Sequence, residues 1–282
     1  MVKIIDGKIL ADKIKYEVAA EIFKLKGQRP NLAIILIGER EDSVLYVSLK
    51  EREAKKVGID THIYKCPADI SEREVYDTID FLNKDDSIDA ILVQLPLPKN
   101  FDTDGIIMAI DPAKDVDRFH PTNLEKLLAG GDDEKIMPPL LSVILEILKS
   151  IDYDIKDKKV CVVANSDIFG RSVKKVLECQ GGKVVVANVN DADLAKRTAV
   201  ADVLITAVGK PQFIKKEMIK EGVVIIDIGI AKEGEEVCGD VDFEDVEGKA
   251  GFITPVPGGV GPMTIAMLFK GTLDIYKNRR SS

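Results

Sequence analysis

Short apolar runs alternate with longer amphipathic stretches along almost the whole chain. This alternation is typical of a parallel sheet whose strands are joined by crossover helices, so the pattern predicts an α/β fold. In the first half, the apolar runs predict strands at residues 32–37, 62–65 and 90–94. The amphipathic stretches between them predict helices around residues 10–25, 43–57 and 72–83.

The second half repeats this alternation after a break in composition. An acidic, loop-rich passage at residues 102–117, followed by Pro121 and the pair Pro138-Pro139, indicates a change of domain. We expect a helix at 141–148 and a closing helix at about 263–276 that returns to the first domain. Between these helices, apolar runs predict strands at residues 159–163, 183–187, 203–206 and 223–228.

Composition limits the classes of function that the chain can have. With 282 residues, 45% of them apolar, the chain can bury a sizeable core. The net charge of −8, the pI near 5.1 and the absence of Trp argue against nucleic-acid and membrane-surface partners. Residues 1–6 lead directly into an element, and we find no apolar run long enough to span a membrane. We therefore expect a cytoplasmic protein that acts on small molecules.

Cysteine and histidine offer little material for metal or nucleophilic chemistry. The chain contains four cysteines and two histidines, which are Cys66, Cys161, Cys179, Cys238, His62 and His120. Because no two cysteines form a Cys-x-x-Cys pair, we interpret them as small buried apolar residues and expect no metal site. A Gly-x-Ser-x-Gly turn is also absent, which disfavours a Ser-His-Asp hydrolase.

The segment from Pro255 to Thr264, Pro-Val-Pro-Gly-Gly-Val-Gly-Pro-Met-Thr, is unusually rich in glycine and proline. Glycine lets a ligand or a second backbone come close, and proline keeps a loop stiff. Pro262 suits the first position of the apolar helix that follows, so the segment predicts a rigid concavity at a helix N-terminus. From these residues alone, an ordinary turn between a strand and the last helix is equally consistent.

Tyr46 and Lys50 stand four residues apart in a predicted helix, so they share one face. A phenol beside an ammonium can serve as an acid/base pair, because a partly desolvated lysine exchanges protons nearer neutrality. The alternative is a tyrosine at the edge of the core with a lysine whose stem lies along the surface.

Two further motifs lie in the first half. Gln94 begins the sequence Gln-Leu-Pro-Leu-Pro at a strand end, where ligands of α/β sheets usually bind, and could orient Lys50 or hold a carbonyl. The alternative is an amide that satisfies loop backbone. The segment 114–117, Lys-Asp-Val-Asp before Arg118, offers two carboxylates for a bidentate contact to a guanidine-like edge. Its alternative is a charged, solvated loop.

The turn after the first strand of the second half, residues 164–170, occupies the place of a dinucleotide-binding turn. The glycine pattern is poor, because Ala164 stands at the first position and the middle glycine is missing. Gly170 is expected to open the next helix, whose N-terminus favours phosphate, and Asp191 has about the spacing of a ribose-binding carboxylate. A turn without a ligand is the alternative.

Taken in order, these motifs resemble the bifunctional 5,10-methylenetetrahydrofolate dehydrogenase/cyclohydrolase family, from about Ile4 to Tyr276. The matching positions are 5–8, Gly38, Ser43, Tyr46, Val47, Lys50, Ala54, Gly58, 94–98, 114–117, 227–230, 239–242 and 255–264. The resemblance implies oxidation of methylenetetrahydrofolate with NAD(P) and hydrolysis of the methenyl product. It also implies a homodimer whose protomer has an α/β catalytic domain (1–120 with 263–282) and a Rossmann-like domain (139–262). Long helices would join the two domains across a cleft.

The resemblance also assigns residues. Lys50 would be the catalytic acid or base, Tyr46 and Asp117 would hold the pterin, Gln94 would orient Lys50, and residues Pro257, Gly258 and Gly259 would contact the substrate. The cofactor would bind at Ala164, Asn165, Ser166, Gly170, Val189 and Ile230. No metal is implied.

Several positions depart from the family pattern. Asn165 stands where the family has an Arg, and Val189 stands where it has a Ser; both of those residues suit a 2′-phosphate. The family therefore implies NADP, while this sequence makes NAD plausible. Arg171 is an alternative contact for the phosphate. Arg118 stands where Gly is usual, and Met137-Pro-Pro139 and Leu141 also differ. The alternatives are a cyclohydrolase with weak or lost dehydrogenase activity and a non-catalytic folate-binding protein. A short-chain dehydrogenase is disfavoured, because its glycine-rich turn would precede Tyr46.

Overall fold

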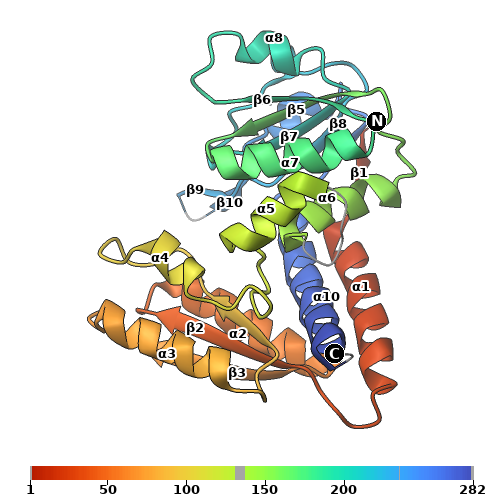
Figure 1. Cartoon of the computed structure of the whole chain (residues 1–282). Coiled ribbons are helices and arrows are strands. Elements are labelled where there is room, and N and C mark those ends of the chain that lie inside the picture. The colour runs from red at the N-terminus through yellow and green to blue at the C-terminus, as the bar shows by residue number, and fades with distance from the viewer. Residues whose placement is uncertain (1, 131–136, 235, 281–282) are drawn as a thin grey trace. The chain divides into compact units, whose positions relative to one another are not determined.

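The computed structural model describes residues 2–130, 137–234 and 236–280 (Figure 1). These residues form two compact units. The small-sheet unit comprises the described residues of 12–126, 134–139 and 265–282, and the large-sheet unit comprises those of 1–11, 127–133 and 140–264. The chain passes between the units within the helices α1 (Gly7–Phe23), α5 (Pro121–Gly130), α6 (Pro139–Ser150) and α10 (Val260–Arg280).

The small-sheet unit contains a parallel sheet with the strand order β3-β2-β4. Its strands are β2 (Asn31–Ile37), β3 (Asp60–Cys66) and β4 (Ala90–Val93), joined by α2 (Glu41–Val57) and α3 (Glu72–Lys84). The run of buried residues along β2 fits its central place, because a central parallel strand is covered on both faces. The strands and helices predicted in the first half are confirmed, with small shifts at their ends.

Helix α3 shows how the sequence sets the start and the buried face of an element. Ser71 Oγ accepts a hydrogen bond from Glu74 N at 3.3 Å, and the Glu74 carboxylate accepts one from Ser71 N at 3.0 Å. This capping box satisfies two backbone donors at the start of the helix. Val75, Ile79 and Leu82 are buried at helical spacing and pack in the core of this unit.

The prediction of a loop-rich passage at residues 102–117 is partly wrong. The passage contains α4 (Thr103–Met108), which Asp102 caps by accepting a hydrogen bond from Gly105 N at 3.1 Å. Helix α5 was not predicted either. A six-residue helix offers too few positions for a helical period, and an aspartate at the cap looks like a loop residue in the sequence.

The large-sheet unit contains a six-stranded parallel sheet with the order β1-β11-β8-β7-β5-β6. Its strands are β1 (Lys3–Ile4), β5 (Lys159–Ala164), β6 (Lys183–Ala187), β7 (Val203–Ala207), β8 (Val224–Asp227) and β11 (Phe252–Ile253). The strands predicted in the second half are confirmed. The short strands β1 and β11 were not predicted, and neither was the antiparallel pair β9 (Ala231–Glu233) and β10 (Glu236–Cys238). Such short segments show no alternation of apolar and polar residues.

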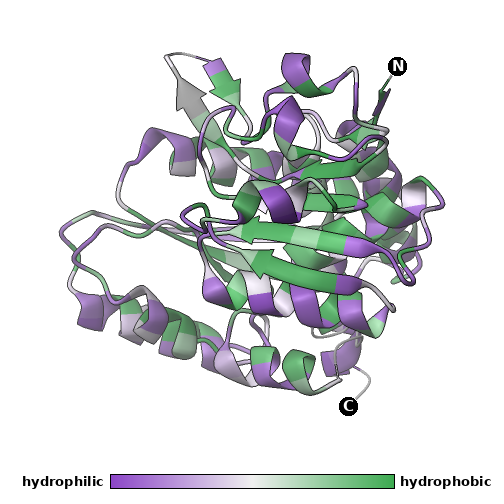
Figure 2. Cartoon of the chain, turned by 90° about the horizontal axis from the view of Figure 1, so that it is seen from above, coloured by the Kyte–Doolittle hydropathy of each residue, from purple (hydrophilic) through white to green (hydrophobic). Residues whose placement is uncertain are grey.

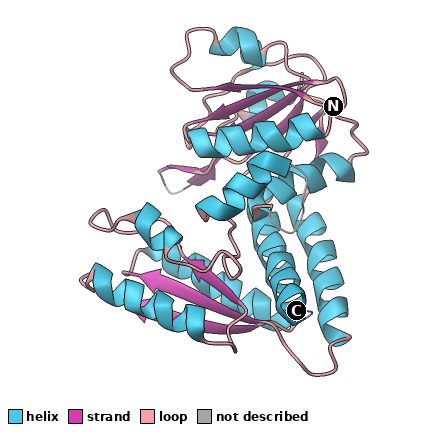
Figure 3. Ribbon diagram, viewed as in Figure 1, coloured by secondary structure: helices cyan, strands magenta, loops and turns pink. Residues whose placement is uncertain are grey.

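Helices cover this sheet, and α7 (Asp167–Cys179) packs against β5 and β6 (Figure 3). The unit also contains α8 (Leu194–Thr198), α9 (Phe243–Val246) and the 3-10 turn Lys216–Met218, while α6 confirms the helix expected at 141–148. Hydrophobic colour follows the strands, and the helices carry both colours (Figure 2). The buried core therefore lies along the sheet, as the apolar runs predicted.

Strand order determines where a ligand can bind in the large-sheet unit. Strand β6 lies on one side of β5, and β7, the next strand in sequence, lies on the other side. The connection after β5 runs to β6 and the connection after β7 runs to β8, so they leave in opposite directions. In doubly wound sheets, ligands bind at such a switch point, in the crevice outside the carboxyl ends of the two strands.

The closing helix is confirmed but begins earlier than expected. Because α10 starts at Val260, Pro262 is its third residue, and the prediction that Pro262 stands first is wrong. The first four N–H groups of a helix have no intrahelical partner, so proline is tolerated at each of these positions.

Candidate active site

Lys50 and Gln94 meet in the small-sheet unit. Helix α2 presents Lys50, and Gln94 follows β4 directly. Lys50 Nζ donates a hydrogen bond to Gln94 Oε1 at 2.8 Å, and Gln94 Nε2 donates to Leu95 O at 2.6 Å. The second bond fixes which end of the amide faces the ammonium. Gln94 therefore contacts both Lys50 and the loop backbone.

Burial changes the protonation of Lys50 and of Asp117. Desolvation lowers the pKa of Lys50, and the negative charge of Asp117 opposes this with a smaller effect. Desolvation raises the pKa of Asp117 to about 6, Lys50 acts against this rise, and Asp115 adds to it. Both groups are therefore closer to their neutral forms near pH 7 than exposed side chains would be. Such shifted pairs are typical of sites that transfer protons.

Tyr46 lies one turn before Lys50 on α2 and remains 37% exposed. Its neighbour Val47 is buried at 3% exposure, so the helix turns its apolar side to the core and keeps the tyrosine on the accessible side. A partly exposed ring fits both a tyrosine at the edge of the core and a tyrosine that contacts a ligand. It remains available to a ligand.

The segment 114–117 divides into a structural part and an open part. Lys114 is buried, and its Nζ donates hydrogen bonds to Leu82 O at 2.8 Å and Asp85 O at 2.7 Å at the end of α3. Asp115 is also buried and accepts hydrogen bonds from Arg118 N at 3.0 Å and His120 N at 2.8 Å. The alternative of a solvated loop is therefore wrong for these two residues.

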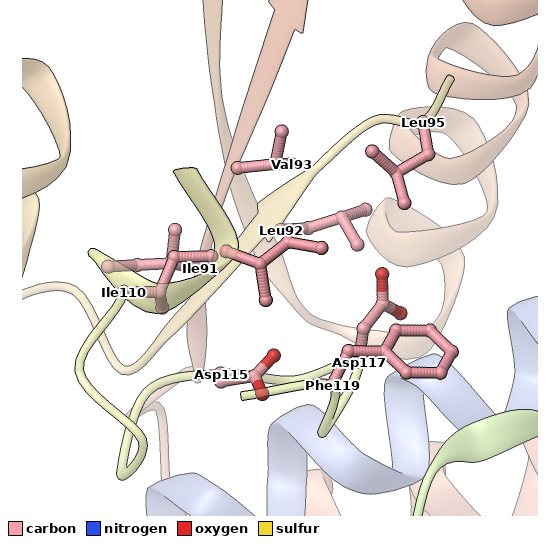
Figure 4. A pocket seen from close by; sticks show the side chains of 9 residues that line it. Ile91, Leu92, Val93, Leu95, Ile110, Asp115, Asp117 and Phe119 are labelled. Carbon is pink, nitrogen blue, oxygen red and sulfur yellow. The ribbon is translucent and has the colours of Figure 1, made fainter. Parts of the chain in front are cut away.

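Asp117 reaches a small pocket at the end of β4 (Figure 4). The pocket is lined by Ile91, Leu92, Val93, Leu95, Ile107, Ile110, Asp115, Asp117 and Phe119. Figure 4 shows the Asp117 carboxylate between the side chains of Leu92, Leu95 and Phe119. Phe119 and Leu95 were not among the predicted site residues, although Leu95 lies within the motif 94–98 and Phe119 directly follows Arg118. A carboxylate can accept two parallel hydrogen bonds from the polar edge of a flat ring.

The glycine- and proline-rich segment lies in the large-sheet unit. The Val256–Pro257 peptide bond is cis, and Gly258 has φ of +105°, which favours glycine. A Cβ on Gly259 would lie 2.5 Å from Pro255 O, and a Cβ on Gly7 would lie 1.7 Å from Gly259 O. The close approach at Gly259 is therefore made by the protein's own backbone. Nothing lies within 4 Å of a Cβ built on Gly261.

The turn after β5 leads directly into α7. Ser166 Oγ caps the helix by accepting a hydrogen bond from Phe169 N at 3.3 Å, so α7 begins at Asp167. Gly170 is its fourth residue, and the prediction that Gly170 opens the helix is wrong. A Cβ at Gly170 would lie 2.7 Å from Val186 Cγ1, so the glycine lets the helix pack closely on β6. This is the role of the third glycine in dinucleotide-binding turns.

Asn165 joins the two turns that border the crevice. Its Nδ2 donates a hydrogen bond to Val208 O at 3.0 Å, which connects the turn after β5 to the turn after β7. Ala164, at the end of β5, is buried. Ile230, which follows β8, is 54% exposed, and Val189 packs against the core of this unit.

The loop after β6 presents a carboxylate. Asp191 Oδ2 accepts a hydrogen bond from Asn188 N at 3.1 Å and lies 3.5 Å from Arg197 Nη1. Arg171, considered as a phosphate ligand, lies 3.6 Å from the Asp167 carboxylate in an exposed pair on α7. The guanidinium groups of Arg197 and Arg171 therefore each face a carboxylate of this chain.

The described residues also lack two other features. Within residues 2–130, 137–234 and 236–280, no group of three or more His, Cys, Asp or Glu side chains is arranged to hold a metal ion. Among the helices described, none is both long enough and apolar enough to cross a membrane.

Two family models match the chain. The model of the tetrahydrofolate dehydrogenase/cyclohydrolase catalytic domain matches residues 5–117, and that of the NAD(P)-binding domain matches residues 139–280. The chain is 45% identical over 283 residues to the bifunctional protein FolD of a Nitratiruptor species, a match that covers 99% of this chain and 100% of that protein. It is 44% identical over 282 residues to FolD of Aquifex aeolicus, covering 99% and 97%.

Solved structures agree with this match. FolD of Campylobacter jejuni superposes with a TM-score of 0.94 at 39% identity, covering 99% of this chain and 100% of that one. FolD of Trypanosoma brucei, complexed with NADP and an inhibitor, gives a TM-score of 0.95 at 32% identity, covering 100% and 99%. The NAD-dependent 5,10-methylenetetrahydrofolate dehydrogenase of Saccharomyces cerevisiae, at 21% identity, shares the fold with a TM-score of 0.81 and covers 98% of this chain and 97% of that one.

Proposed function

Because the chain belongs to the tetrahydrofolate dehydrogenase/cyclohydrolase family, we propose that it catalyses two consecutive one-carbon reactions. The first is NAD(P)-dependent oxidation of 5,10-methylenetetrahydrofolate to the 5,10-methenyl form. The second is hydrolysis of the methenyl form to 10-formyltetrahydrofolate. The observation that carries this proposal is the 2.8 Å hydrogen bond between Lys50, with its lowered pKa, and Gln94.

The large-sheet unit fits a dinucleotide. Its crevice lies at the switch between β5 and β7, Ser166 caps the helix that follows β5, and Gly170 allows that helix to pack closely on β6. The N-terminus of α7 would face the phosphates, since free N–H groups and the helix dipole favour negative charge. When bound, the nicotinamide accepts the hydride that leaves the methylene carbon. Ala164, Asn165, Val189 and Ile230 would line this site.

Lys50 is suited to the hydrolytic step. As a neutral amine it would take a proton from the water whose oxygen bonds to the methenyl carbon. It would then pass this proton to the folate nitrogen as the bond from that nitrogen to the carbon breaks, while the hydroxyl proton is released to solvent and the formyl C=O forms. Gln94 would hold the amine in position, because its own amide is fixed by Leu95 O. The oxidation needs no strong base, since the nitrogen lone pair assists loss of hydride.

Two other side chains and one backbone segment would bind the folate. Asp117, in the apolar pocket, would accept hydrogen bonds from the amino-pyrimidine edge of the pterin. Tyr46, exposed on the face of α2 that carries Lys50, would pack on the ring. The backbone of Pro257, Gly258 and Gly259 would contact the substrate as well, and a Cβ on Gly259 would lie 2.5 Å from Pro255 O, which requires glycine there.

For the coenzyme we propose NAD in preference to NADP. A 2′-phosphate needs a cationic fork, and the loop after β6 offers Asn188, Val189 and the Asp191 carboxylate instead. Asp191 suits a ribose hydroxyl and would repel a phosphate. Asn165 stands where the family has Arg, and its amide is engaged with Val208 O. The nearby Arg197 faces Asp191.

Three assays on one preparation test these proposals. We expect oxidation of methylenetetrahydrofolate with NAD at a kcat/KM at least about tenfold above that with NADP, together with hydrolysis of the methenyl form. A higher kcat/KM with NADP would overturn the coenzyme proposal. Hydrolysis without oxidation would indicate a cyclohydrolase alone, and no turnover in any assay would indicate a folate-binding protein.

We also propose the domain limits and the assembly that the family suggests. The catalytic domain would span residues 1–120 and the closing helix from 263 to 282, and the NAD(P)-binding domain would span 139–262. A homodimer would form along β6, which is an edge strand of the large sheet and carries the half-exposed Val185.

A further inference from the structure

Asp240 is a buried carboxylate that holds one turn of the backbone. It is 0% exposed and lies between β10 and α9. Its Oδ2 accepts hydrogen bonds from Thr206 Oγ1 at 2.7 Å and from Val208 N at 2.8 Å. Its Oδ1 accepts one from Lys210 N at 2.8 Å. Two peptide groups of the turn after β7 are therefore fixed by a side chain about thirty residues further along the chain.

A second buried carboxylate fixes Asp240 in turn. Asp227, at the end of β8, accepts hydrogen bonds from Asp240 N at 3.2 Å and Val241 N at 2.9 Å. The segments that carry Asp227 and Asp240 pack closely against each other. A Cβ on Gly229 would lie 2.1 Å from the Asp240 carboxyl carbon, and a Cβ on Gly239 would lie 2.1 Å from Asp227 Oδ2. Each glycine thus makes space for the aspartate of the other segment.

The turn that Asp240 holds borders the crevice between β5 and β7. Val208 O accepts the hydrogen bond of Asn165, whose own turn leads into α7. A continuous set of hydrogen bonds therefore runs from Asp227 through Asp240 to Val208 and Asn165, across the carboxyl ends of β8, β7 and β5. Ligands of doubly wound sheets bind at this edge.

We propose that Asp240 is a positioning residue for the dinucleotide, an inference that rests on the proposed dehydrogenase activity. Its carboxylate holds the peptide groups of Val208 and Lys210 in the geometry that the coenzyme meets. Hydrolysis of the methenyl form uses no coenzyme, and Lys50, Gln94 and Asp117 belong to the small-sheet unit. Loss of the Asp240 carboxylate should therefore affect the oxidation but not the hydrolysis.

The variant Asp240→Asn tests this proposal. Asparagine keeps the shape but replaces one acceptor oxygen by an amino group, which leaves a backbone N–H of the turn without its acceptor. We expect the dissociation constant of NADH, from fluorescence titration, and the KM for NAD to rise roughly ten- to a hundredfold. The kcat/KM of methenyl hydrolysis should stay within about twofold of the wild-type value, because a local role leaves the Lys50 site intact.

Asp242→Asn is the matched control. Asp242 stands two residues away and accepts hydrogen bonds from Lys215 Nζ at 2.6 Å and Asp245 N at 3.1 Å, outside the turn after β7. It should leave both coenzyme constants unchanged. If Asp240→Asn does not fold, Thr206→Val, which removes one donor to the carboxylate, should raise the NADH dissociation constant several-fold while hydrolysis is kept.

Three outcomes would overturn the proposal. Equal loss of both activities in a folded Asp240→Asn protein would show a general structural role. Unchanged NADH affinity and KM would show that the turn does not position the coenzyme. A wild-type protein that binds neither NADH nor NADPH would instead remove the proposed dehydrogenase function, on which the inference rests.

Discussion

Lys50 is the residue on which the proposed hydrolysis depends. Its amine combines a hydrogen bond to Gln94 with a pKa that burial lowers. Lys50→Met should reduce methenyl hydrolysis by roughly 10²- to 10⁴-fold, because the amine that would take the proton of the attacking water is removed. The decay of the methenyl absorbance measures this rate, and circular dichroism checks the fold.

Lys50→Arg sharpens this test. Arginine keeps the positive charge and can still donate to Gln94, but it does not deprotonate near neutral pH. We expect it to be about as inactive as Lys50→Met. Wild-type rates in either folded variant would show that Lys50 is not the proton acceptor.

Asp117 should make folate binding depend on pH. Burial raises its pKa to about 6, so the carboxylate is ionised above this pH and protonated below it. Only the ionised form accepts hydrogen bonds at both oxygens from a pterin edge. The affinity for tetrahydrofolate should therefore fall by about tenfold between pH 7 and pH 5.

Binding titrations across this range, with Asp117→Asn as the comparison, measure the effect. The amide does not titrate, so the variant should bind weakly with no step near pH 6. A wild-type profile that is flat from pH 5 to pH 7 would contradict the proposed contact.

At the level of single elements, the packing of α7 on β6 depends on one missing side chain. A Cβ at Gly170 would lie 2.7 Å from Val186 Cγ1, and strand and helix are both held in the core. Gly170→Ala should therefore lower the free energy of unfolding by about 1–3 kcal/mol. It should also weaken NADH binding, because the first turn of α7 has to shift.

Gly248→Ala is the control for this substitution. A Cβ at Gly248 meets nothing within 4 Å, and its backbone is not left-handed. It should be neutral or slightly stabilising in urea unfolding. A Gly170→Ala protein as stable as Gly248→Ala would mean that helix and strand are not packed as closely as described.

The first two residues of the segment 114–117 stabilise neighbouring backbone. Lys114 closes the end of α3, and Asp115 holds the backbone of Arg118 and His120. Arg118, which replaces the usual Gly, takes a left-handed φ of +60° and lies directly after Asp117. The buried residues Lys114 and Asp115 thus stabilise the loop that places the Asp117 carboxylate in the pocket.

At the scale of the whole molecule, the proposed homodimer can be tested at β6. Val185 is 46% exposed on this edge strand, where an apolar side chain favours pairing with a second copy. Val185→Lys should shift the protein from dimer to monomer in sedimentation velocity, because a lysine would be buried against its symmetry mate.

Val200→Lys provides the comparison. Val200 is 51% exposed and lies between α8 and β7, outside the edge strand β6. This variant should sediment as the wild type does. A dimer that survives Val185→Lys, or a wild-type protein that is monomeric, would contradict the proposed assembly.

The order of the motifs along the chain determined the family and the fold class. Apolar runs predicted most of the buried strands because parallel strands are covered on both faces, a requirement that is local in sequence. The spacing of Tyr46 and Lys50 likewise placed both on one helix. Short elements such as α4 and β11 were not predicted because so few residues show no periodicity, and β11 forms only by pairing with β1 and β8.

Only the tertiary structure decided what most of the polar residues do. Lys114 and Asp115 look like a solvated loop in sequence but are buried, while Asp117 beside them reaches the pocket. Asp240, Val208 and Asn165 come from three separate segments, and no periodicity connects them. Hydrogen bonds and clashes between residues far apart in the chain depend on the fold, so the sequence determined the elements and the candidate residues, and tertiary contacts assigned their roles.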